Sequence, residues 1–301
     1  MKGRALAIVL VVGAGVVVGA GSSRLAWAQT ETTAPDIPGV VKGGTKVELV
    51  ATGLRGADGP IAAADGTLLF TEPDANRISR IDASGRVTPY LSNTNGTVGL
   101  AFDRHGRLIA VQTTNPQIAV LSPTRDVLAD SFEGQPLVSP SDLTSDRNGG
   151  IYFSDPGKPA VFYIRSDGDL LKAADDIEGP NGVLLSPDER VLYVANTLGD
   201  SVLAFDVQPD GSLTNRRTFA RLTRPDGLAV DAAGYVYVAG VAGIQVFNPQ
   251  GRHLGTIPIG IANGPQNLAF AGPDKKTLYV VGRTAAWKIA MQSQGPKDRA
   301  K

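Results

Sequence analysis

The chain of 301 residues contains no cysteine and only two histidines, His105 and His253. The absence of cysteine excludes a disulfide framework, a thiolate zinc site and a cysteine nucleophile. Two histidines make a multi-histidine metal site nearly impossible. The 29 basic residues are balanced by 29 acidic ones, so the chain lacks the positive charge that binding to a nucleic-acid backbone requires. We therefore expect no nucleic-acid partner.

The first residues have the pattern of an export signal. A basic start, Met1–Arg4, is followed by an uncharged run of about 17 residues rich in Val, Ala and Gly. Ala26, Trp27 and Ala28 fit the small-x-small cleavage rule, so the mature chain is expected to begin at Gln29. The run is short for a membrane span, and an uncleaved anchor is the alternative. We predict a signal peptide over residues 1–28, a periplasmic or secreted protein, and no stable membrane association after cleavage.

An internal repeat determines the fold prediction. A short apolar strand recurs six times, at steps of about 40 to 44 residues. The copies begin at Thr67, Arg107, Gly150, Val191, Tyr235 and Thr277. This period is typical of a four-stranded propeller blade, and no helical period of useful length follows the leader. The sequence therefore predicts an all-β fold, a six-bladed β-propeller of four-stranded antiparallel blades.

The last repeat lacks a fourth strand, because polar and turn residues follow the segment around Trp287. An extra alternating strand, Lys46–Val50, lies before the first repeat. Pairing these two would close the ring and cover two exposed strand edges. We thus predict a flexible lead-in over residues 29–44, the propeller over 45–291, and a disordered tail over 292–301.

The repeat also aligns the starts of the innermost strands, which face the central tunnel. The aligned starts are Asp58, Val98, Ser141, Asn181, Asp226 and Gln266, and the next positions are Gly59, Gly99, Asp142, Gly182, Gly227 and Asn267. Two carboxylates, two carboxamides and a hydroxyl at one tunnel mouth are ligands that a hard cation such as Ca²⁺ or Mg²⁺ prefers. The glycines allow backbone and ligand to approach closely.

Turn formation is the competing explanation for these residues. Asp or Asn before Gly is a strong turn signal, and each motif taken alone is explained by it. However, Val98 occupies the same place in the second repeat, so the turn does not demand an oxygen ligand there. The recurrence in ring register favours a metal site.

Several segments carry a family resemblance. Among them are Asp65–Phe70, Ser139–Leu143, Ile151–Pro156, Gly179–Val183 and Arg224–Leu228. Together they resemble the gluconolactonase, regucalcin (senescence marker protein) and luciferin-regenerating-enzyme family of six-bladed propellers. The similarity extends from about Gly53 to Ile289.

The resemblance implies a ligand set. In that family a Glu-Gly-Pro, a Pro-Asn-Gly and a Pro-Asp-Gly place three metal ligands, which map onto Asp58, Asn181 and Asp226. A family Asn-Asp pair near substrate and metal maps onto Ser141 and Asp142. The implied cofactor is one divalent cation, with Ca²⁺ first and Mg²⁺, Mn²⁺ or Zn²⁺ as alternatives. Because Asp58 is shorter than the family Glu and Ser141 replaces the family Asn, gluconolactone itself does not follow as the substrate.

The implied reaction is metal-assisted hydrolysis of a lactone, a cyclic carboxylic ester. Asp226, or Asp142 across the tunnel, is the candidate catalytic base that orients and deprotonates water. Ser141, Asp142 and Gln266 are the candidate substrate-binding residues.

Serine catalysis is disfavoured, since no Gly-x-Ser-x-Gly elbow is present and both histidines are expected to be solvated surface residues. A non-catalytic propeller that binds a small ligand or a protein partner is the alternative function. The sequence leaves the oligomeric state open.

Overall fold

The computed structural model describes residues 32–262 and 264–298. The expected signal peptide and its cleavage point before Gln29 lie outside these residues and stay predictions. Within the described ranges, no helix is long and apolar enough to cross a membrane.

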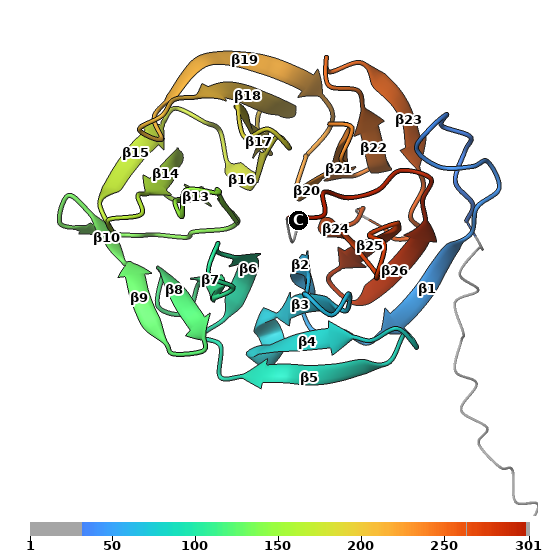
Figure 1. Ribbon diagram of the computed structural model, residues 1–301, viewed down its shortest axis with the longest axis horizontal. Helices are drawn as coiled ribbons and strands as arrows, with labels where there is room; N and C mark the ends of the chain where they lie inside the picture. The colour runs from blue at the N-terminus through green and yellow to red at the C-terminus, as the bar shows by residue number, and fades with distance from the viewer. Residues whose placement is uncertain (1–31, 263, 299–301) are drawn as a thin grey trace, which may run out of the picture. The chain divides into compact units, whose positions relative to one another are not determined.

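The strands form six four-stranded antiparallel sheets around one axis, which confirms the predicted propeller (Figure 1). The first three blades are β2 (Asp58–Ala62), β3 (Leu68–Glu72), β4 (Arg77–Ile81) and β5 (Val87–Ser92); β6 (Thr97–Phe102), β7 (Leu108–Gln112), β8 (Gln117–Ser122) and β9 (Asp126–Ala129); and β12 (Leu143–Ser145), β13 (Ile151–Asp155), β14 (Ala160–Ile164) and β15 (Leu170–Ala174). The fourth and fifth are β16 (Pro180–Leu185), β17 (Val191–Asn196), β18 (Ser201–Val207) and β19 (Leu213–Arg221); and β20 (Leu228–Val230), β21 (Val236–Gly240), β22 (Gly243–Phe247) and β23 (His253–Ile257).

The sixth blade closes the ring in the predicted way. It contains β24 (Asn267–Ala271), β25 (Thr277–Gly282) and β26 (Ala285–Ala290), and its outer strand is β1 (Val47–Thr52) from the start of the propeller. β1 runs antiparallel to β26 with Leu49 opposite Trp287. The pairing supplies the missing fourth strand and covers the edge of β26.

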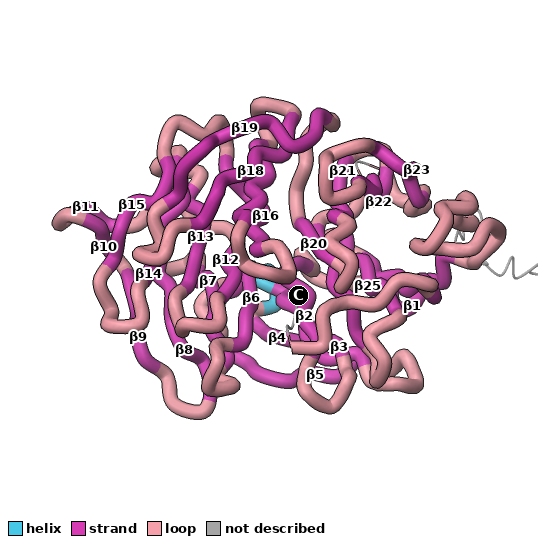
Figure 2. Tube along the Cα trace, turned by 45° about the horizontal axis from the view of Figure 1, so that its top comes forward, coloured by secondary structure: helices cyan, strands magenta, loops and turns pink. Residues whose placement is uncertain are grey.

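Burial explains why the second strand of each blade contains an apolar run. β3, β13 and β21 are buried along their whole length, because each blade packs between two neighbours. The buried apolar side chains fall into six clusters, and each cluster joins two adjacent blades. Strands dominate the tube view, where η1 (Pro73–Ala75) is a single short helical turn (Figure 2).

Two segments differ from the prediction. Residues 32–44 do not form a simple flexible lead-in, because Ile37, Val40 and Val41 are buried in the cluster between the fifth and sixth blades. A two-stranded hairpin that the repeat does not predict, β10 (Ser131–Phe132) with β11 (Gln135–Pro136), lies between the second and third blades.

The tail also differs from the expected disorder, as far as residue 298. Gln292 and Ser293 donate backbone N–H groups to Val40 O, and Lys275 Nζ donates to Pro296 O at 2.7 Å. Asp298 forms an ion pair with Arg147 of the third blade at 2.7 Å. The chain after β26 therefore crosses back over the ring toward its centre (Figure 1).

Candidate active site

The predicted ring of strand starts has the same burial in all six blades. The first residue of each pair is partly buried, and the second is fully buried. The partly buried set is Asp58, Val98, Ser141, Asn181, Asp226 and Gln266, and the buried set is Gly59, Gly99, Asp142, Gly182, Gly227 and Asn267. The alignment made from the repeat therefore corresponds to equivalent positions in space.

The glycines of the buried set allow neighbouring blades to approach closely. A Cβ on Gly59, whose φ is +48°, would lie 2.2 Å from Val98 O of the next blade. A Cβ on Gly182 would lie 2.4 Å from Asp226 O. No side chain fits at such distances, so glycine at these positions brings the strand starts together.

Each of the three predicted metal ligands accepts a hydrogen bond from a side chain of a neighbouring blade. Asn267 Nδ2 donates to Asp58 Oδ1 at 3.1 Å, and Ser141 Oγ donates to Asn181 Oδ1 at 2.9 Å. Gln266 Nε2 donates to Asp226 Oδ2 at 2.9 Å. Such donors fix the orientation of ligand oxygens, as supporting residues do in metal sites.

These contacts refine the roles expected from the sequence. Ser141 and Gln266, predicted to bind substrate, each orient a predicted ligand. Asn267 belongs to the aligned ring but had no predicted role, so its part in the site was missed from the sequence. The residue type could have indicated this role, because Asn267 is the only residue with a side-chain amide among the six at the second ring position.

Asp142 is less accessible than Asp226. Asp142 is only 2% exposed, and its Oδ1 accepts a hydrogen bond from the backbone N–H of Leu143 at 2.9 Å. Asp226 is partly buried at the mouth. Of the two candidate bases, Asp226 thus has the better access to a water molecule and a substrate.

Polar residues at the end of the second strand hold the segments that lead into the ring. In the first blade, Glu72 accepts the backbone N–H of Arg55 at 3.1 Å. In the second, Gln112 Nε2 donates to Thr94 O at 2.9 Å. In the third, Asp155 accepts the N–H groups of Val138 and Ser139, both at 2.9 Å. Glu72 and Gln112 are further positioning residues that sequence reasoning missed.

The carboxylate of Glu72 is fully buried and ionised. Burial raises its pKa, but hydrogen bonds from Arg77, Ser79 and the Arg55 backbone outweigh that effect. The net pKa of Glu72 is therefore below its ordinary value of 4.5. Through the backbone N–H of Arg55, the buried carboxylate of Glu72 holds the segment that leads to Asp58.

Both histidines are exposed, as predicted. His105 accepts a hydrogen bond from Arg104 Nε at 3.1 Å in a surface turn, and His253 contacts Thr256 at 3.1 Å. Neither contact joins them to the ring of strand starts.

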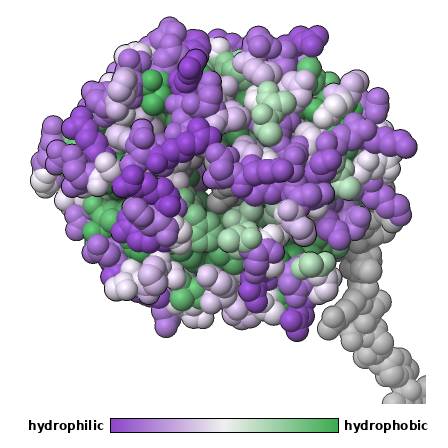
Figure 3. Space-filling view, viewed as in Figure 1, coloured by the Kyte–Doolittle hydropathy of each residue, from purple (hydrophilic) through white to green (hydrophobic). Residues whose placement is uncertain are grey.

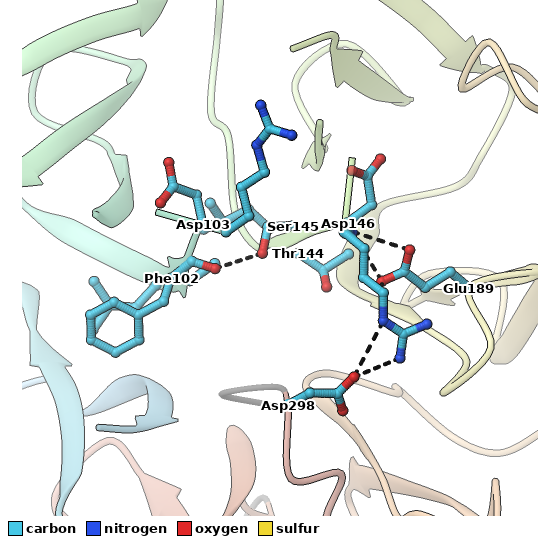
Figure 4. A pocket seen from close by; sticks show the side chains of 12 residues that line it. Phe102, Asp103, Thr144, Ser145, Asp146, Glu189 and Asp298 are labelled. Carbon is cyan, nitrogen blue, oxygen red and sulfur yellow. Dashed lines mark hydrogen bonds and ion pairs between the residues drawn. The ribbon is translucent and has the colours of Figure 1, made fainter. Parts of the chain in front are cut away.

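A separate cavity lies at the opposite end of the inner strands. Figure 4 shows it between the ends of β6 and β12, where Arg147 bridges Glu189 and Asp298. Its lining includes Leu100, Phe102 and Leu143. None of the predicted ligands lines it, so this cavity is distinct from the candidate site.

The comparison with known families adds to this geometry. Residues 57–284, well over half of the chain, match the family described as SMP-30/Gluconolactonase/LRE-like region. The chain belongs to this family.

Individual members of the family align with most of this chain, and those of known structure share its fold. The gluconolactonase of Zymomonas mobilis is 25% identical over 292 residues, which cover 82% of this chain and 81% of that protein. A solved gluconolactonase of Xanthomonas campestris has a TM-score of 0.78 at 27% identity, covering 87% of this chain and 95% of that one. The calcium-binding protein regucalcin of Agrobacterium tumefaciens has a TM-score of 0.68 at 17% identity, covering 83% and 95% of the two chains. The last likeness concerns the fold alone.

The donor set fits the cation that the SMP-30/gluconolactonase family implies. Oxygen ligands suit Ca²⁺ and Mg²⁺, and each predicted ligand has a hydrogen-bonded neighbour that orients it. Among the described residues, no group of three or more His, Cys, Asp or Glu side chains is arranged to hold a metal ion. The predicted set is of a different kind, because one of its three members is the amide of Asn181.

Proposed function

We propose that this chain is a lactone hydrolase that uses a divalent cation held by Asp58, Asn181 and Asp226. The observation that carries the proposal is the set of hydrogen bonds from Asn267, Ser141 and Gln266 to these three side chains. Membership of a family whose members include gluconolactonases supports the reaction class. Ca²⁺ is the first candidate, since oxygen ligands of mixed charge and flexible geometry suit it.

The residues divide the work in this proposal. When bound, a cation of this kind polarises the lactone carbonyl as a Lewis acid, which lowers the barrier by several kcal/mol. Asp226 accepts the proton of the attacking water, a contribution of about 10²–10⁴-fold. Gln266 holds one carboxylate oxygen of Asp226, so that the second oxygen keeps a defined direction. Asp142 is the second candidate base.

The substrate proposal stays at the level of lactones. Asp58 has a shorter side chain than the family Glu, and Ser141 replaces the family Asn beside the ligand Asn181. Both substitutions lie at the site itself, so we expect them to change how a sugar lactone fits there.

A panel of lactones assayed with EDTA and metal add-back tests the proposal. We expect wild-type turnover to disappear in EDTA and to return with Ca²⁺ or another divalent cation. Turnover that persists fully in EDTA would contradict the role of the cation. A bound cation without turnover of any lactone would favour the non-catalytic binding function instead.

We also propose that the protein is exported. Lys2 and Arg4, the uncharged run and the Ala26–Ala28 motif support this. N-terminal sequencing of the protein expressed in a Gram-negative host should return Gln29. Recovery of Met1 or Lys2 on membrane-bound material would instead support an uncleaved anchor.

A further inference from the structure

Large apolar side chains are exposed at six described positions: Leu49, Tyr90, Val127, Val138, Leu198 and Val241. Leu49, Tyr90 and Val127 lie on β1, β5 and β9, which are outermost strands of their blades. The other three lie in loops on the face that carries the ring of strand starts. These three therefore lie on the face of the candidate site and not on the outer edge of a blade.

Leu198 is the most exposed of the six, at 69%. It lies in the turn between β17 and β18, and its N–H donates to Glu178 O at 3.0 Å. The hydroxyl of its neighbour Thr197 donates to Pro225 O at 2.6 Å. Because Pro225 precedes Asp226 and Glu178 lies three residues before Asn181, the turn that holds Leu198 contacts the segments that lead to two predicted ligands.

Val241 lies in the corresponding turn of the fifth blade, and Val138 lies in the segment that leads into β12 of the third blade. Val241 follows β21, whose Ala239 O accepts the N–H of Asp226 at 2.9 Å. Val138 lies three residues before Ser141, where Asp155 holds its N–H at 2.9 Å. Val241 is 46% exposed and Val138 54%. The mouth thus carries apolar side chains over the third, fourth and fifth blades.

The corresponding turns of the first, second and sixth blades carry polar residues. At the turn that corresponds to Leu198, the first blade has Asp74 and the sixth has Arg283, which pair at 3.3 Å. The second blade has Asn115, whose N–H donates to Asn95 at 3.1 Å. We call the side of the mouth over the third to fifth blades, which carries the exposed Val138, Leu198 and Val241, the apolar half.

The apolar half suits a narrow occupant. Exposed Glu178 and Arg224 lie among the three apolar side chains, so they interrupt any broad contact surface. A single hydrocarbon chain can contact Leu198 and Val241 while its head group lies over the tunnel. Leu198, Val241 and Val138 offer the hydroxyls of a sugar lactone no hydrogen-bond partner, so these three side chains add nothing to the binding of that substrate.

We infer that Leu198, Val241 and Val138 bind an alkyl substituent of the substrate, so that the site prefers alkyl-substituted lactones over polyhydroxylated sugar lactones. The inference rests on the proposed function, because it places the ester group of the same molecule over Asp58, Asn181 and Asp226. A methylene that is fully buried improves binding about fourfold, and a half-covered one about twofold.

The test compares kcat/KM for δ-valerolactone, δ-octalactone, δ-decalactone and glucono-δ-lactone in the Ca²⁺-loaded protein. We expect wild-type kcat/KM to rise with alkyl length, mainly through KM, and to be lowest for glucono-δ-lactone. In Leu198→Ser and Val241→Ser the ratio of δ-decalactone to δ-valerolactone should fall about three- to tenfold. Val127→Ser, an equally exposed valine on the outer strand β9, should keep the wild-type ratio.

An unchanged ratio in Leu198→Ser and Val241→Ser, or a preference of the wild type for glucono-δ-lactone, would overturn the inference. If the wild type hydrolyses no lactone, the proposed function fails, and binding still tests the apolar half of the mouth. Calorimetry with 6-pentyl-2-piperidinone and unsubstituted 2-piperidinone, two unreactive lactams, then decides. Tighter binding of the pentyl compound, lost in Leu198→Ser, supports the inference, and equal binding overturns it.

Discussion

Asn267, Ser141 and Gln266 orient the oxygens of the candidate metal ligands from neighbouring blades. The sequence predicts that these residues meet, because the repeat aligns them in two rings. It does not predict which side chain donates to which. The bond from Asn267 to Asp58 joins residues 209 positions apart, and it exists only because the sixth blade closes against the first.

Removal of one such donor should weaken cation binding without unfolding the protein. In Gln266→Met the side chain keeps its length but no longer donates to Asp226 Oδ2. Loss of a supporting hydrogen bond typically costs 10- to 100-fold in metal affinity, so we expect a loss of about that size in Ca²⁺ titration calorimetry. Gln250→Met, in an exposed turn of the fifth blade, is the matched control. Equal affinity of the two variants would contradict the supporting role of Gln266.

Glu72 makes stability depend on pH. Its folded-state pKa lies below 4.5, so the stabilisation is present above about pH 4.5 and is lost as the pH falls through the folded-state value. Glu72→Gln should be less stable than wild type at pH 7 by about 1–3 kcal/mol, because the hydrogen bonds that its buried donors make to a neutral amide are weaker than those to a carboxylate. In urea unfolding from pH 7 to pH 3, the free energies of unfolding of the two proteins should converge. Glu133→Gln, at the exposed tip of the β10–β11 hairpin, should follow the wild-type curve, and a constant gap for Glu72→Gln would contradict this account.

Among the strands, those with strong local patterns were predictable. The recurring strand was expected to begin at Val191 in the fourth blade and at Thr277 in the sixth, and β17 and β25 begin there. The β10–β11 hairpin was missed because each of its strands has two residues, too few for any alternation. The packed tail was missed for another reason, since its Gln, Gly, Pro and Lys residues have loop composition and their contacts are all long-range.

Strand β1 should be required for a closed, monodisperse ring. Deletion of residues 45–51 leaves the edge of β26 unpaired, and an exposed edge promotes association with other chains. We expect a lower melting temperature and larger species in size-exclusion chromatography. A peptide of residues 45–52 added in trans should partly reverse both effects. Unchanged melting and elution after the deletion would show that the ring closes without β1.

For the molecule as a whole, the two ends of the inner strands differ. One end carries the candidate site, and the tail crosses the other, where Asp298 reaches Arg147. Figure 3, in the same view as Figure 1, shows largely polar surface around a hollow with hydrophobic walls. The tail and the cavity beside it thus lie at the other end of the inner strands from the predicted ligands.

The ion pair of Arg147 with Asp298 should hold the end of the tail weakly. Both side chains are more than half exposed, so the pair contributes about 0.2–1 kcal/mol. In Arg147→Gln, hydrogen exchange at the backbone N–H of Gly295, which donates to Lys275 O, should accelerate up to about fivefold. High salt should have a similar effect on the wild type. Arg252→Gln, a surface change on the fifth blade, should leave this exchange unchanged, and protection unaffected by both Arg147→Gln and salt would contradict a role for the pair.

The most direct test of the account is lactone turnover by Asp226→Asn under Ca²⁺ saturation. The substitution keeps the shape and one ligand oxygen of Asp226 but removes its charge and basicity. We expect kcat to fall by about 10²–10⁴-fold while the circular dichroism spectrum and melting temperature stay close to wild type. Asp126→Asn, at the exposed start of β9, should retain wild-type kcat. Comparable turnover by wild type and Asp226→Asn, both saturated with Ca²⁺, would contradict the proposed mechanism.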